Sequence, residues 1–132
     1  MIKTVYIGAD QEGYNFKKHL INDLKSDGLI VVDLGVFMIE EQATLEDLGR
    51  EIGEKVAQDS ESIGIIIEET GLNMCIVADE MSKVHPAICL KDQDIDFDAT
   101  NCNTVCLSEN CMDYPTSLQK VRKFIHSKNN HQ

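Results

Sequence analysis

Acidic side chains follow two apolar runs of this sequence. Asp10 comes shortly after the run at residues 2–8, and Glu68 and Glu69 come directly after the run at 63–67. A carboxylate buried beside apolar groups can act as a general base near neutral pH, because burial raises its pKa. Three carboxylates could alternatively hold a divalent cation. These three residues are therefore the first candidates for chemistry.

Other residue types that do chemistry are poorly placed. The aspartates at positions 92, 94, 96 and 98 alternate as in a calcium loop, but the turning glycine and the closing glutamate are missing, which favours a solvated acidic helix start. No histidine follows a predicted strand, so no nucleophile–histidine pair is expected. The five cysteines lack the paired spacing of a zinc site and read as reduced thiols. These patterns therefore predict neither a calcium site nor a zinc site.

Five apolar runs alternate with helical patterns along the chain. The spacing predicts strands at residues 2–8, 29–34, 63–67, 85–90 and 103–107, and helices at 14–26, 45–58, 71–80, 92–100 and 114–127. This alternation predicts a doubly wound, Rossmann-like α/β fold of three layers, in which helices cover both faces of a five-stranded parallel sheet. Ligands of such folds bind beyond the carboxyl ends of the strands, which is where Asp10, Glu68 and Glu69 stand.

Length and charge limit the classes of function. The 132 residues fit a single domain, residues 1–132, with a polar and frayed tail at 127–132. The net charge of −11 argues against nucleic acid and anionic membranes as partners, since both need a basic face. The chain enters a strand without a leader pattern, and no apolar run is long enough to span a bilayer, so we expect a cytoplasmic protein.

Two predicted strand ends carry recognisable motifs. The first reads IGADQEG at residues 7–13, and the second reads GIIIEETGLNM at residues 64–74. Both resemble the ribose-5-phosphate isomerase B and galactose-6-phosphate isomerase family, where the first strand ends in Gly-x-Asp and a later loop reads Gly-Thr-Gly-x-Gly-Met. The first motif is nearest to the A-type galactose-6-phosphate isomerase subunit. The motifs stand at matching strand ends in the family's order, and the resemblance covers roughly residues 1–125.

The resemblance implies aldose–ketose isomerisation of a sugar phosphate. In this family a base moves a proton between C1 and C2 through an enediolate, while backbone amides of the glycine-rich loop hold the developing oxyanion. The resemblance implies no metal or organic cofactor. It also implies an active site between two subunits, and hence a homodimer or a higher oligomer. Because the A-type subunit works with a B-type partner, a hetero-oligomer with such a subunit is a further implication.

Matching the motifs assigns candidate site residues. Asp10, Thr70 and Gly71 match retained family residues. Asn101 matches a position around the family's His-Asn-Asp-x-Asn-Val segment. The remaining matches are replacements: Gln11 for a phosphate-contacting histidine, Glu68 for the cysteine base, Glu69 and Asn73 for loop glycines, and Thr100 near the ring-opening histidine. The family's arginine-rich C-terminal segment has no counterpart. The resemblance thus implies catalytic roles for Asp10, Glu68 and Thr70. It implies substrate contacts for Asp10, Gln11, Glu69, Thr70, Gly71, Asn73, Thr100 and Asn101.

Two functions are compatible with this pattern of retained and replaced residues. The first is a divergent subunit of a sugar-phosphate isomerase in carbohydrate metabolism, with Glu68 as the replacement base and a sugar or sugar phosphate as ligand. The second is a non-catalytic paralogue that binds a small ligand or a partner protein in a regulatory role. Acidic side chains at the strand ends would repel a phosphate dianion, which is compatible with either a changed substrate or lost catalysis.

Overall fold

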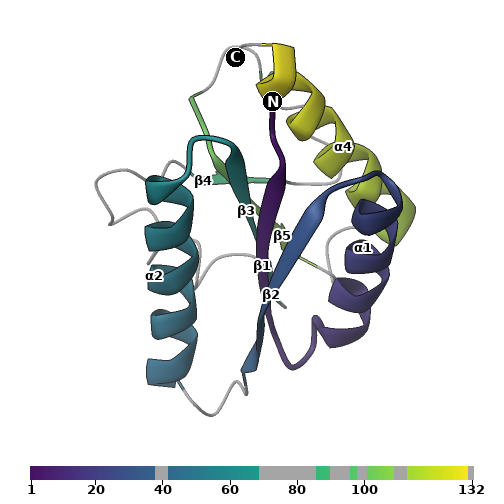
Figure 1. Ribbon diagram of the computed structural model, residues 1–132. Coiled ribbons are helices and arrows are strands. Elements are labelled where there is room, and N and C mark those ends of the chain that lie inside the picture. The colour runs from purple at the N-terminus through teal and green to yellow at the C-terminus, as the bar shows by residue number, and fades with distance from the viewer. Residues whose placement is uncertain (38–41, 69–85, 90–95, 98–100, 109–112, 131–132) are drawn as a thin grey trace.

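Strands and helices alternate over residues 4–68, as the sequence predicts. A computed structural model describes residues 1–37, 42–68, 86–89, 96–97, 101–108 and 113–130, with the backbone alone described at 36–37 and 42–46. The elements are β1 (Thr4–Asp10), α1 (Tyr14–Ser26), β2 (Ile30–Phe37), α2 (Gln42–Gln58), β3 (Ser62–Glu68), β4 (Pro86–Ile88), β5 (Thr104–Ser108) and α4 (Tyr114–Asn130) (Figure 1). The predicted helix at 71–80 lies outside the described residues.

The five strands form one parallel sheet in the order β2-β1-β3-β5-β4. Helices α1 and α4 cover one face and α2 covers the other, so the predicted three-layer doubly wound fold is confirmed (Figure 1). β1 lies between β2 and β3. From β1 the chain passes to β2 on one side, and it then crosses back to β3 on the other side, so the strand order reverses at β1. This reversal of strand order is where ligands of doubly wound folds bind. No helix in the described part of the chain is long and apolar enough to cross a membrane.

The central strand β3 is buried on both faces of the sheet. Its odd-numbered isoleucines, Ile63, Ile65 and Ile67, join the cluster beneath α1 and α4, and Ile66 joins the cluster beneath α2. Each of these side chains is fully buried, and burying an isoleucine contributes roughly 1.5–3 kcal/mol. The strand therefore reads as a continuous apolar run rather than an alternating one.

Two glycines let α2 approach the backbone of the sheet. A Cβ at Gly8 would lie 2.8 Å from the Cδ1 of Leu48, and a Cβ at Gly64 would lie 2.8 Å from the Cγ2 of Ile52. Both contacts are too short for a side chain to be added without movement. The absence of side chains on β1 and β3 at these positions thus fixes where α2 lies.

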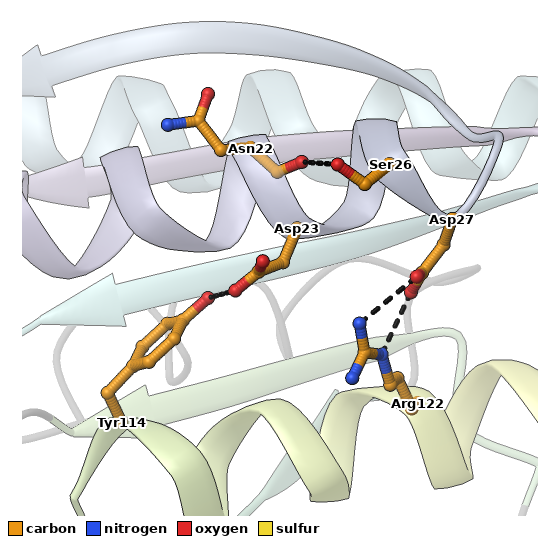
Figure 2. Close-up of polar contacts among 6 residues, drawn as sticks. All are labelled: Asn22, Asp23, Ser26, Asp27, Tyr114 and Arg122. Carbon is orange, nitrogen blue, oxygen red and sulfur yellow. Dashed lines mark hydrogen bonds and ion pairs between the residues drawn. The ribbon is translucent and has the colours of Figure 1, made fainter.

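Polar contacts join α1 to α4, the two helices on the face of the sheet opposite α2. The hydroxyl of Tyr114 donates to the Oδ2 of Asp23 at 2.5 Å, and Arg122 donates through Nε and Nη2 to both carboxylate oxygens of Asp27 at 2.9 and 3.0 Å (Figure 2). The ring of Tyr114 also meets that of Phe16 edge to face, with centroids 5.2 Å apart. The two polar contacts and this ring contact add to the apolar packing that holds the two helices together.

The last helix differs from its predicted end. It continues to Asn130, so residues 127–130, predicted to fray, are helical, and Ser127 is buried. The reason is a tertiary contact: the Oδ1 of Asn129 accepts the backbone N–H of Ile2 at 2.7 Å. In the predicted helix at 92–100 only Asp96 and Phe97 are described, and neither is helical. Phe97 is buried against Phe124 instead, with ring centroids 5.2 Å apart.

The cysteines divide into two chemical states. Cys89 and Cys102 are free and buried, as predicted. Cys106 is disulfide-bonded, so the prediction of five reduced thiols is wrong there. Burial raises the pKa of the Cys89 thiol to about 11.

Candidate functional site

Three strands end in buried polar residues at the same edge of the sheet. Asp10 is the last residue of β1, Glu68 of β3 and Ser108 of β5, and each is at most 3% exposed. Ala9 pairs with Ile67, and Glu68 pairs with Ser108, so the three polar residues form one row across neighbouring strands. Adjacent strands lie about 5 Å apart, which brings the two carboxylates and the hydroxyl within reach of a single small ligand.

The row also shares one face of the sheet. Side chains alternate between faces along a strand, so Asp10 has the orientation of Gly8, and Glu68 has the orientation of Gly64. Both glycines face the side chains of α2. The two carboxylates therefore stand on the α2 side, at the carboxyl ends of β1 and β3, where the strand order reverses.

Asp10 also has a local structural role. Its Oδ1 accepts the backbone N–H of Gly13 at 2.9 Å, which closes the turn from β1 into α1. Gly13 precedes the helix and provides no side-chain cap. A Cβ at Gly13 would lie 2.8 Å from the Cγ2 of Ile67 and 3.2 Å from its carbonyl oxygen, so only glycine lets the turn approach β3 this closely. The turn fixes the carboxylate of Asp10 in place.

The other sequence-predicted residues fall into two groups. Gln11 is exposed just after β1, close in sequence to Asp10. Asn101 is exposed and precedes β5, so it lies toward the amino-terminal ends of the parallel strands. Glu68 lies at the carboxyl end of β3. A single chain therefore does not bring Asn101 to the row of strand-end residues. The remaining predicted residues lie outside the described residues: Glu69, Thr70, Gly71, Asn73 and Thr100.

Ser108 is a candidate site residue that matching the family motifs did not assign, although it directly follows a predicted strand. The predicted strand ended at residue 107, whereas β5 continues to Ser108 in register with Glu68. A serine at the end of an apolar run is by itself a weak indication of a ligand site. The strand register shows that this serine lies beside Glu68. Among the described residues, no three His, Cys, Asp or Glu side chains are grouped to hold a metal ion. The interpretation as a metal site requires Glu69 and stays a hypothesis.

A cavity of about 300 Å³ lies at the other end of the molecule. Ile2, Leu29 and Ile125 contribute its apolar lining, and Arg122 and Asp27 contribute charge from α4 and from the end of α1. None of the strand-end carboxylates lines it. This cavity is therefore separate from the row formed by Asp10, Glu68 and Ser108.

Comparison with known proteins places this fold and its strand-end motifs in one family. The family described as Ribose/Galactose Isomerase matches residues 5–132. The chain belongs to the ribose/galactose isomerase family. The resemblance read from the two strand-end motifs is thereby confirmed at the level of the family.

Individual relatives agree with this assignment. A Rickettsia conorii protein with the provisional name sugar phosphate isomerase is 29% identical over 86 residues, which are 65% of this chain and 59% of that relative's length. A Rickettsia bellii protein with the same provisional name is 25% identical over 126 residues, covering 94% of this chain and 87% of the relative. The crystal structure of ribose-5-phosphate isomerase B from Mycoplasma genitalium with bound ribulose-5-phosphate superposes with a TM-score of 0.81 at 26% identity, covering 95% of this chain and 84% of that one.

Proposed function

We propose that this chain is a divergent sugar-phosphate isomerase subunit that binds a sugar or sugar phosphate at the carboxyl ends of β1 and β3. The observation that carries the proposal is the pair of buried carboxylates, Asp10 and Glu68, at the strand-order reversal of an isomerase-family sheet. The Mycoplasma genitalium relative solved with ribulose 5-phosphate exemplifies the ligand class.

Glu68 is the proposed base. Buried beside apolar strand residues, its carboxylate takes the proton from the carbon next to the substrate carbonyl and returns it to the former carbonyl carbon. Asp10, fixed by the Gly13 amide, positions a substrate hydroxyl. Ser108 stands beside Glu68 in register and offers a hydroxyl donor to the substrate oxygen or to the base. Thr70 and Gly71 of the following loop retain the family's role of holding the oxyanion.

Charge makes a partner subunit necessary for tight phosphate binding. A phosphate dianion near two carboxylates is destabilised by on the order of 1 to a few kcal/mol at intermediate dielectric. The chain carries a net charge of −11. We therefore propose at least a dimer, with a B-type subunit as the candidate source of cationic groups. The separation of Asn101 from Glu68 within one chain also favours a site completed by a second subunit.

A second candidate function is a non-catalytic paralogue that binds a small ligand or a partner protein for regulation. The replacement of the family's cysteine base by Glu68 favours it. Both candidates use the same site, so they are separated by turnover and not by binding.

The test is an NMR titration of the purified chain with ribulose 5-phosphate, together with an isomerisation assay with and without a B-type galactose-6-phosphate isomerase subunit. Glu68→Gln removes one negative charge and the base at nearly constant volume. We expect it to tighten binding about 5- to 30-fold, or roughly 1–2 kcal/mol, and to abolish turnover. Glu61→Gln is the matched control, because Glu61 is an exposed carboxylate paired with Lys3 before β3.

The outcomes are distinct. Turnover that appears with the partner subunit and is lost in Glu68→Gln supports the isomerase. Binding without turnover under any condition supports the regulatory paralogue. Equal affinities of the Glu68→Gln and Glu61→Gln variants, or no binding of ribulose 5-phosphate and ribose by any variant, would overturn the proposed site.

A further inference from the structure

Lys17 is a buried lysine near the start of α1. Its side chain is 2% exposed, and it lies on the helix face that also carries the fully buried Leu20 and Leu24. Lysine is almost never buried unless its charge is paired. The partner is Asp33 on β2, whose Oδ1 lies 2.7 Å from the Nζ of Lys17. The pair thus ties the first turns of α1 to an edge strand of the sheet.

The same oxygen of Asp33 holds an irregularity in β2. It accepts the backbone N–H of Gly35 at 2.8 Å. Ile7 pairs with Asp33 and Ala9 pairs with Val36, so two residues of β2 lie opposite one residue of β1. Gly35 has a φ of +108°, a conformation that favours glycine. These features define a β-bulge at residues 34–35, and Asp33 connects it to the ammonium of Lys17.

The bulge decides what lies beside Asp10. After it, Phe37 pairs with Asp10; with regular pairing from Asp33 onward, Val36 would stand there. A slip of one residue moves every later side chain to the other face of the sheet. The bulge therefore sets which face of the end of β2 borders the strand-end carboxylate.

We propose that Lys17 and Asp33 are positioning residues of the ligand site, which act by locking this bulge so that the end of β2 and the turn after β1 hold Asp10 in place. Two sets of contacts connect the Lys17–Asp33 pair to Asp10. The first is the bulge, which makes Phe37 the strand partner of Asp10. The second is the first turn of α1, where the backbone N–H of Gly13 donates to the Asp10 carboxylate. The expected effect on ligand affinity rests on the proposed function, whereas the expected effect on the position of Asp10 does not.

The test uses Lys17→Met, which keeps the alkyl chain and removes the charge, and Asp33→Ala, which removes the shared acceptor. The control is Lys3→Met, which breaks the ion pair with Glu61 at 3.3 Å, where the side chains are 66% and 46% exposed. Amide hydrogen exchange of Gly35 and the amide resonance of Gly13, which reports the hydrogen bond to Asp10, are followed by NMR. Ribulose 5-phosphate affinity is measured in parallel.

Both site variants should speed Gly35 exchange about tenfold, shift the Gly13 amide and weaken ribulose 5-phosphate binding about 5- to 20-fold, while Lys3→Met changes none of the three. If a single variant fails to fold, the double variant Lys17→Met, Asp33→Ala decides, because it removes the buried charge together with its partner. A variant that releases Gly35 but leaves the Gly13 amide unchanged overturns the proposal. If the wild type binds no phosphosugar, the proposed function fails, and the two amides still decide whether Lys17 and Asp33 position Asp10.

Discussion

The contact between Tyr114 and Asp23 offers a quantitative test of what holds α4 against α1. Tyr114→Phe removes one oxygen and keeps the ring, which retains its edge-to-face contact with Phe16. Only the 2.5 Å hydrogen bond to Asp23 is lost. A hydrogen bond to a charged group contributes roughly 1.5–3 kcal/mol. Both partners are partly exposed and water can replace the hydroxyl, so we expect a loss of about 1–2 kcal/mol in the free energy of unfolding.

The assay is urea denaturation at pH 7 of wild type, Tyr114→Phe, Asp23→Ala and the double variant. For a chain of this length the expected loss corresponds to a melting temperature lower by roughly 3–8 °C. The double-mutant cycle should return a coupling energy of about 1–2 kcal/mol. Arg122→Met is the comparison: Arg122 and Asp27 are 48% and 35% exposed, and exposed ion pairs contribute only about 0.2–1 kcal/mol.

The pH dependence of stability gives an independent test of the hydrogen bond between Tyr114 and Asp23. Burial, the hydrogen bond to Asp23 and the charge of Asp23 all raise the pKa of Tyr114. A tyrosine in the unfolded chain loses its proton near pH 10, whereas folded Tyr114 keeps it. The stabilisation is therefore fully present below about pH 10 and is lost as the pH rises through the folded pKa. The advantage of wild type over Tyr114→Phe should shrink in that window. A coupling energy below about 0.3 kcal/mol, or an advantage that grows with pH, would refute the reasoning.

Three further outcomes are expected. Gly13→Ala should lower the free energy of unfolding by about 1–3 kcal/mol in urea melts, because the new Cβ would lie 3.2 Å from the carbonyl oxygen of Ile67; a neutral effect would contradict that packing. Iodoacetamide at pH 8 should leave Cys89 unlabelled in the folded chain and label it after denaturation, read by mass spectrometry, because burial and a pKa of about 11 suppress its thiolate roughly a hundredfold. Light scattering at micromolar concentration should report a dimer or larger species; a monomer would contradict the proposed two-subunit site.

Two glycines mark the places where predicted strand ends were wrong. The predicted strands stopped at Gly8 and just before Gly35. In the structure β1 continues through Gly8 because the missing side chain makes room for Leu48, and β2 continues past Gly35 because that residue forms a bulge. Gly64 makes the same kind of room inside β3. The apolar runs thus predicted that strands exist, while the reason for each glycine lay in a partner element.

Side-chain roles were harder to predict than elements. Tyr14 is an aromatic residue at the start of the first helix and is 45% exposed, whereas the charged Lys17 on that helix is buried. A signal for Lys17 existed: it stands three and seven residues before Leu20 and Leu24, on their face of the helix. Recognising it required pairing it with Asp33 inside another apolar run, and that pairing depends on a register no local pattern encodes.

The register that builds the strand-end row also limits its chemistry. Asp10 and Glu68 are the last residues of neighbouring parallel strands, so the hydrogen bonds of the sheet hold them side by side whatever ligand is present. A polar edge formed in this way can bind hydroxyl groups of a sugar through its acceptors. Its carboxylates and hydroxyl cannot themselves neutralise a phosphate, because none of these three residues carries a positive charge. We therefore propose that the cationic groups for phosphosugar binding come from beyond this row, from a second subunit.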